Sequence, residues 1–139
     1  MNAPHTPVSI QSNADRVRKR THPVFNRAID ARTDENVARY RGRPRTEIVN
    51  RIRELDREWD IERILETNAS SLALAGVLLG ATVSRRWLAL PTAVLGFLLL
   101  HATQGWCPPL PFFRARGIRT RGEIDQEKFA LLRELEREP

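Results

Sequence analysis

The residue of this chain with the most evident chemical potential is its single cysteine, Cys107. A thiol becomes nucleophilic and redox-active when nearby cations lower its pKa, and Arg114 and Arg116 follow Cys107 closely in the sequence. Cys107 is therefore a candidate reactive thiol, and the alternative function that it suggests is a redox or sulfur-handling membrane protein. An inert cysteine close to a membrane surface is the interpretation that we favour.

A metal site at Cys107 is not expected. The neighbouring histidine, His101, lies six residues earlier, and this spacing puts the two side chains on different faces of a helix. Zinc sites use about four ligands, and neither a second cysteine nor a carboxylate lies close by in the sequence. The sequence thus predicts no metal, no cofactor and no catalytic residue, and an enzyme is not expected.

A block of basic residues without any acidic residue follows the cysteine. It consists of Arg114, Arg116, Arg119 and Arg121. Anionic lipid head groups attract each basic residue near a membrane surface by about 1 kcal/mol, so we expect these four arginines to contact lipid head groups. The earlier basic cluster at residues 16–20 has little aromatic interleaving, and nucleic acid is not an expected partner.

Two uncharged segments position these candidate residues. Residues 67–84 and 87–113 hold 18 and 27 residues without a charge, and only Arg85 and Arg86 separate them. A bilayer core about 30 Å thick requires about 20 mostly apolar residues in a helix. The pattern predicts a transmembrane helical hairpin over residues 67–113. The net charge of +6 and the mean hydropathy of −0.43 average this apolar centre with highly charged arms.

Small residues in both segments predict how the two helices pack. Gly76 and Gly80 form a GxxxG motif, and Thr92 and Gly96 are also small and four residues apart. Small residues let transmembrane backbones approach each other closely. A turn at residues 85–86 would place Gly76 opposite residues 95–96 and Gly80 opposite residues 91–92. We favour this packing within the hairpin, with self-association through the same face as the alternative.

Polar residues gather near the open end of the predicted hairpin. They include Asn68, Ser71, His101 and Gln104. Polar groups inside a membrane are candidates for function, and a ligand or quinone-head site is one interpretation. Side chains of this kind also hydrogen-bond between transmembrane helices. We favour the second interpretation and expect a structural polar collar.

The charged arms on either side of the hairpin differ in pattern. Residues 1–45 are polar, and we expect them to be largely disordered, with at most a short helix over residues 24–40. Residues 46–66 form a predicted amphipathic helix that runs unbroken into the first span, with Ile48, Ile52, Leu55 and Trp59 on one face.

The C-terminal arm, residues 114–139, contains the basic segment and then a second amphipathic helix. Thr120 and Glu123 have the spacing of a capping box. The apolar stripe of this helix comprises Ile124, Leu131 and Leu135, widened by Phe129 and Leu132. We expect this helix to dock on the helix that contains Trp59, because its acidic residues could pair with arginines there.

Basic residues predict the orientation of the hairpin in its membrane. Ten of them flank the open end and two occupy the turn, and the end richer in Lys and Arg usually stays in the cytoplasm. Both termini are therefore expected to be cytoplasmic. The first 30 residues hold no apolar run of signal-peptide length, and no cleaved signal is expected.

Two short motifs resemble the end of the YgaP-like transmembrane domain family. They are Gly105-Trp106-Cys107-Pro108 and Gly117-Ile118-Arg119-Thr120. Residues 58–63 and 72–76 resemble a longer bacterial subgroup with an N-terminal extension, so that the resemblance covers roughly residues 46–135. Pro109 and Pro111 depart from the pattern that commonly follows the cysteine.

The resemblance implies a small bacterial inner-membrane protein of a family whose function is mostly unknown. In some members the hairpin follows a rhodanese sulfurtransferase domain and helps it to dimerise. Residues 1–66 are too short and too polar for such a domain, so a sulfurtransferase activity cannot be transferred to this chain.

Together these observations predict an all-α membrane protein. It would have a two-span helical hairpin, amphipathic cytoplasmic helices and a disordered N-terminus. Its expected location is the bacterial inner membrane, and its expected role is structural, as an anchor or accessory subunit. The expected partners are membrane lipids and either a second copy of the chain or another membrane protein.

Overall fold

The chain is described by a computed structural model over residues 13–137, and these residues form helices without any strand. The helices follow in the order α1 Asn13–Arg20, α2 Pro23–Tyr40, α3 Arg45–Arg57, α4 Ile61–Thr82, the 3-10 turn η1 Arg85–Leu88, α5 Ala89–Gln104, α6 Leu110–Ala115 and α7 Arg121–Arg137. The predicted all-α class is therefore confirmed.

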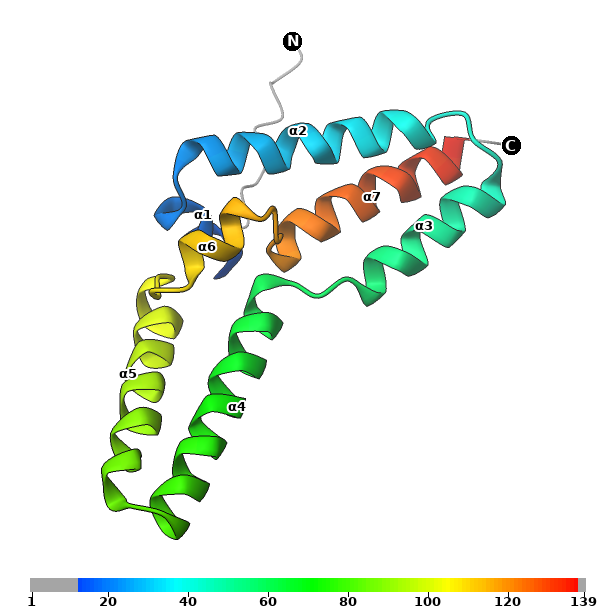
Figure 1. Cartoon of the computed structure of the whole chain (residues 1–139). Coiled ribbons are helices and arrows are strands. Elements are labelled where there is room, and N and C mark those ends of the chain that lie inside the picture. The colour runs from blue at the N-terminus through cyan, green and yellow to red at the C-terminus, as the bar shows by residue number, and fades with distance from the viewer. Residues whose placement is uncertain (1–12, 138–139) are drawn as a thin grey trace.

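Two parts can be distinguished in the molecule. Helices α4 and α5 lie side by side and antiparallel, joined by η1, and they project from a cluster made by α1, α2, α3, α6 and α7 (Figure 1). We call α4 with α5 the helix pair and the other five helices the head. The helix pair contains most of the uncharged centre of the sequence and is charged only in the first turns of α4, whereas the head contains most of the charged residues.

The helix pair contains the two described helices that are long and apolar enough to cross a membrane. The most apolar 18-residue windows of its two helices are only 17% and 6% buried. A core helix of a soluble protein would be mostly covered by the rest of the chain. Large apolar side chains instead point outward along both helices, among them Leu74, Leu78, Leu95 and Leu99.

The head has a core of its own, which forms where α7 lies between α2 and α3 (Figure 1). Its buried residues are Ile48, Leu55, Ile124, Leu131 and Leu135. The predicted stripe of α7 therefore does face the helix of residues 45–57, as expected. Phe129 does not belong to it, because 57% of this residue is exposed, and Trp59 is also 47% exposed.

The helix predicted to run unbroken from residue 46 into the first span is interrupted. Helix α3 ends at Arg57, and the backbone of Glu58 is extended. Asp60 then begins α4 as its N-cap, accepting a 2.8 Å hydrogen bond from the Arg63 N–H. Aspartate is a favoured N-cap because its carboxylate satisfies a free backbone donor of the first turn. The prediction of an unbroken helix is therefore wrong, because the Asp60 cap starts a new helix after the extended residue Glu58.

The N-terminal arm is more ordered than we expected for residues 1–45. Residues 13–20 and 23–40 are helical, and Val17 and Ile29 are 2% and 3% exposed. Arg18 of α1 forms ion pairs with Asp30 of α2 and with Glu123 of α7, and so connects three helices of the head. Few apolar residues suffice here because α7 and α6 supply the opposite surface. Residues 1–12 lie outside the described part, and the prediction for them stays untested.

A second apolar cluster connects the head to the helix pair. It comprises Val17, Ile61, Leu65, Cys107 and Leu110, with Phe113 and Ile118 packed against it. Helix α5 ends at Gln104, followed by Gly105 at φ 74°, a left-handed conformation that favours glycine. The second span is thus shorter than the uncharged segment, because residues 107–113 belong to the head.

Candidate functional site

The two glycines of the GxxxG motif lie where α4 meets the second helix. A Cβ added at Gly76 would come within 2.5 Å of Pro91 Cδ, and one at Gly80 within 2.6 Å of Leu88 Cδ2. Both glycines are buried. Their small size therefore permits the close packing of the helix pair, in agreement with the interpretation of the motif as an intramolecular contact.

The predicted partners of these glycines are wrong. A Cβ at Gly96 would meet no atom within 4 Å, and Thr92 is exposed, with its hydroxyl donating to the Leu88 carbonyl of its own helix. The turn begins earlier than predicted. Helix α4 ends at Thr82, with Val83 as its C-cap, and Ser84 is already the N-cap of η1. This shifts the register by about one helical turn and turns the small residues of α5 outward.

The predicted polar collar is not a network between the helices. Asn68 donates to the Ile64 carbonyl at 2.9 Å and Ser71 to the Thr67 carbonyl at 2.7 Å, both within α4. Gln104 is exposed at the end of α5. These side chains satisfy their hydrogen bonds on their own backbone, which is a common solution for Ser, Thr and Asn in apolar surroundings.

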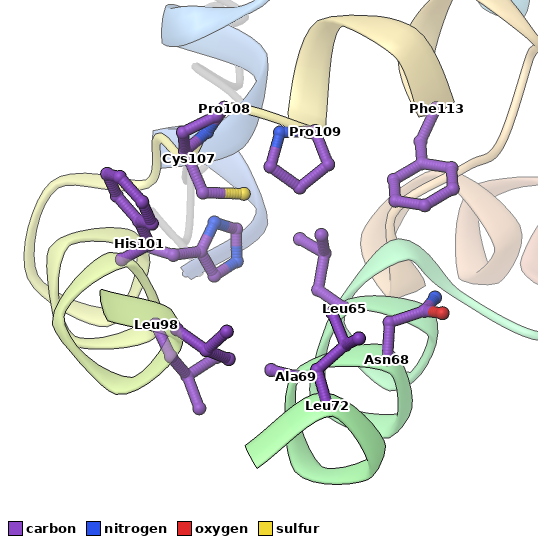
Figure 2. A pocket seen from close by; sticks show the side chains of 12 residues that line it. Leu65, Asn68, Ala69, Leu72, Leu98, His101, Cys107, Pro108, Pro109 and Phe113 are labelled. Atoms are coloured by element: carbon purple, nitrogen blue, oxygen red, sulfur yellow. The ribbon is translucent and has the colours of Figure 1, made fainter. Parts of the chain in front are cut away.

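A pocket of about 340 Å³ lies between α4 and α5 at the end next to the head. Figure 2 shows the His101 ring and the Cys107 thiol directed into this space, with Leu65 opposite. Its full lining is Leu65, Asn68, Ala69, Leu72, Val94, Phe97, Leu98, His101, Cys107, Pro108, Pro109 and Phe113. The structure therefore does bring together Asn68, His101 and Cys107, which the sequence had placed in two separate groups.

Cys107 lacks the surroundings of an activated thiol. Its residue is 4% exposed, and burial raises the pKa of the thiol, a change that the nearby Leu110 N–H opposes only in part. The cations expected to activate it point elsewhere. Arg114 is paired with Glu123, and the Arg116 guanidinium lies 4.2 Å from the centre of the Phe112 ring. The structure thus favours the inert interpretation of this cysteine.

Arg114 of α6 and Glu123 of α7 form a buried ion pair inside the head. Two guanidinium nitrogens of Arg114 donate to the two carboxylate oxygens of Glu123, each at 2.7 Å. Asn26 and Arg18 complete the cluster by accepting from Arg114 and donating to Glu123, respectively. Burial alone would raise the pKa of Glu123, but the hydrogen bonds from Arg114, from the Thr120 N–H and from Arg18 outweigh it and lower this pKa.

A second buried ion pair lies at Arg119, which is completely buried. Its guanidinium donates to Glu58 in the break between α3 and α4 and to Glu127 on α7. Arg51 and Asn36 also donate to Glu127. Burial raises the pKa of Glu127, yet these three donors together lower it below its ordinary value. Arg119 therefore connects α3, α4 and α7 at one point.

The expectation that four arginines contact lipid head groups needs correction. Arg114 and Arg119 are 1% and 0% exposed and serve as internal partners of glutamates. Arg121 is paired with Asp60 at 2.8 Å, whereas Arg116 is exposed. A buried guanidinium is retained where carboxylates compensate its desolvation. The partners of Arg114 and Arg119 are Glu58, Glu123 and Glu127, which lie outside the acid-free block and are not recognisable from local charge.

The two motifs at residues 105–108 and 117–120 each begin with a glycine in a left-handed backbone conformation. Gly105 and Gly117 both have positive φ, at 74° and 78°. A Cβ at Gly105 would also lie 2.8 Å from the backbone of Arg16. Thr120 and Glu123 form the predicted capping box, with bonds of 2.8 and 3.3 Å in the two directions. The first motif thus forms the connection from α5 to the head, and the second forms the connection from α6 to α7.

Residues 13–137 contain no group of three or more His, Cys, Asp or Glu side chains arranged to hold a metal ion. Comparison of the chain with protein-family models, with curated proteins and with solved structures finds no match.

Proposed function

We propose that this chain is a two-span membrane protein whose helix pair forms a transmembrane hairpin and anchors the head at the membrane surface. The observation that carries this proposal is that the apolar residues of both helices face outward. Only 17% and 6% of the most apolar 18-residue window of each helix is buried inside the protein. An apolar surface of this extent is costly in water and is typical of a membrane or protein interface.

The tryptophans support the same placement. Trp87 is 44% exposed beside the turn, whereas Trp59 and Trp106 are 47% and 37% exposed at the end next to the head. Tryptophan is enriched at both surfaces of a membrane. Helix α5 and η1 separate Trp87 from Trp106 by about 30 Å, which is close to the thickness of a bilayer core.

The proposed role is structural, without catalysis. Ion pairs of Arg114, Arg119 and Arg121 fasten the head to the start of α4 and to the segment after α5, so the head is suited to be a fixed docking element rather than a flexible tail. We propose that it serves as an anchor or accessory subunit for a membrane protein or for a second copy of the chain. The alternative redox or sulfur-handling role has less support, since Cys107 is buried and its pKa is raised.

We further propose the bacterial inner membrane, with both termini in the cytoplasm, and membership of the YgaP-like family. The support is the ten-to-two distribution of basic residues around the spans and the two glycine-containing motifs. The head would then lie on the cytoplasmic side.

Cysteine labelling tests the membrane placement. In a Cys107→Ser background, Arg85→Cys should react with a membrane-impermeant maleimide from outside intact cells. Ala115→Cys, an exposed position of the head, should react only after the membrane is opened. Labelling of Arg85→Cys from the cytoplasmic side alone would contradict the orientation, and recovery of the protein in the soluble fraction would contradict the anchor.

A further inference from the structure

We infer that the pocket between α4 and α5 is a binding site for a neutral, membrane-soluble ring compound that carries a carbonyl group, of the quinone class. The pocket is formed at the end of the helix pair opposite the glycine contacts. This inference uses the membrane placement proposed above and adds a ligand to it.

The shape of the helix pair explains why a pocket exists there. Gly76 and Gly80 bring the two helices into close contact near η1. Toward the head, Leu65 and Leu72 of α4 face Val94 and Leu98 of α5 across a volume of about 340 Å³. The pocket is large enough for a substituted ring and is within the usual range for small-molecule sites. Because the flanks of the helix pair are exposed to the bilayer, a ligand could enter directly from the lipid.

The charge of the lining determines which ligands are suitable. None of the twelve lining residues is Asp, Glu, Lys or Arg. A charged phosphate or ammonium head group would therefore lose its hydration without gaining a counter-ion, which is strongly unfavourable. A neutral ligand carries no such penalty, so the pocket selects against whole phospholipids.

Two lining features favour a ring over a plain alkyl chain. Phe97 and Phe113 contribute aromatic rings, and Pro108 and Pro109 contribute flat, rigid side chains. Aromatic rings gain additional stabilisation from stacked or edge-on contacts with another ring. An alkyl chain would fill the same volume without this contribution.

His101 provides a reason for a hydrogen-bonding group on the ligand. Its ring projects into the pocket (Figure 2). Its Nδ1 is buried and has no hydrogen-bond partner in the described part of the chain, so a ligand in the pocket would contact the other ring nitrogen, Nε2. A neutral imidazole has one donor and one acceptor nitrogen. In the tautomer that carries the proton on Nε2, His101 can donate a hydrogen bond to a ligand carbonyl.

The test uses the full chain in nanodiscs and decylubiquinone as the probe. Saturable quenching of tryptophan fluorescence, with Trp106 next to the pocket residue Cys107, reports binding. Ala69→Phe and Val94→Phe fill the pocket from α4 and α5 without adding a tryptophan, and each should abolish the saturable component. Leu99→Phe adds bulk to α5 at a residue that is 66% exposed and does not line the pocket, so it should bind as the unmodified chain does.

Further variants test the role of the imidazole. His101→Leu should weaken binding about fivefold to tenfold, the effect of one hydrogen bond, and His101→Gln should restore part of it. Circular dichroism and nanodisc incorporation establish that each variant is folded. Equal saturable quenching in Ala69→Phe, Val94→Phe and the unmodified chain would overturn the inference, as would equally effective displacement by dodecanol, which would identify an alkyl-chain site. Failure of the chain to enter nanodiscs would instead reject the membrane placement.

Discussion

Arg114 and Glu123 face each other in the interior of the head, with two parallel hydrogen bonds of 2.7 Å between guanidinium and carboxylate. Removal of one partner of a buried pair leaves an uncompensated charge, at a cost of about 3–5 kcal/mol. Glu123→Gln is therefore expected to lower the free energy of unfolding by this amount, measured by denaturant titration of helicity in detergent.

Glu47→Gln is the matched control for this prediction. Glu47 lies 4.0 Å from Arg43 on the surface and is 49% exposed, so its ion pair should contribute less than about 1 kcal/mol. Joint replacement of Arg114 by Met and Glu123 by Gln should be less harmful than Glu123→Gln alone. Similar losses for Glu47→Gln and Glu123→Gln would contradict the importance of burial.

Acid should destabilise the head through Glu123 and Glu127. Both pKa values are below the ordinary 4.5, because the arginine and amide hydrogen bonds outweigh the opposing effect of burial. The carboxylates thus stabilise the folded state fully above pH 4.5, and this contribution is lost as the pH falls through the lowered pKa values. Unfolding measured from neutral pH downward should show this decline, and Glu127→Gln should reduce its size. If the loss of stability at low pH were the same in Glu127→Gln as in the unmodified chain, Glu127 would not contribute to it.

The helix pair should depend on two glycines and not on a third. Gly76→Ile places a Cβ 2.5 Å from Pro91 Cδ of α5, and Gly80→Ile places one 2.6 Å from Leu88 Cδ2 of η1, whereas a Cβ at Gly96 meets no atom within 4 Å. Overpacking of this kind typically costs about 1–3 kcal/mol. Thermal melting in detergent should fall for the first two variants and change little for Gly96→Ile or for Leu78→Ile at an exposed position. Equal melting in all four would refute the assigned interface.

The thiol of Cys107 should react slowly with a water-soluble maleimide. It is 4% exposed, and burial raises its pKa, which lowers the fraction of reactive thiolate. The control is Ala115→Cys in a Cys107→Ser background, at an exposed position of the head, and it should react several times faster. Cys107→Ser by itself should leave the helicity unchanged. Faster labelling of Cys107 than of the control would support the alternative that Cys107 is a reactive thiol.

Local patterns predicted the parts of the fold that depend on neighbouring residues. The two uncharged segments contain most of the two exposed apolar helices, and the Thr120–Glu123 capping box forms as expected. The stripe of Ile124, Leu131 and Leu135 is also buried against α3. Each of these signals is contained within a few turns of one helix, so that the sequence alone is sufficient to recognise it.

The misplaced features depend on contacts between distant residues. Arg119 and Glu58 are 61 residues apart, and no local pattern links them. The arginines were therefore assigned to the lipid surface, although two of them are internal. The contact partner of Gly80 was also predicted wrongly. Residues 85–88 form η1, whereas a tight turn at residues 85–86 would have made residues 87 and 88 the start of α5. The contribution of residues 107–113 to the pocket was missed for the same reason, since the lining comes from three separate segments, α4, α5 and residues 107–113.

The break between α3 and α4 has a mechanical consequence. The Ile61 N–H donates to the Arg119 carbonyl at 2.9 Å, and the Arg119 side chain binds Glu58 just before the break. A pull on α4 along its axis is therefore transmitted through Arg119 to α7. When the chain is pulled out of a membrane in a single-molecule force experiment, α4 and the head should therefore unfold together in a single rupture event.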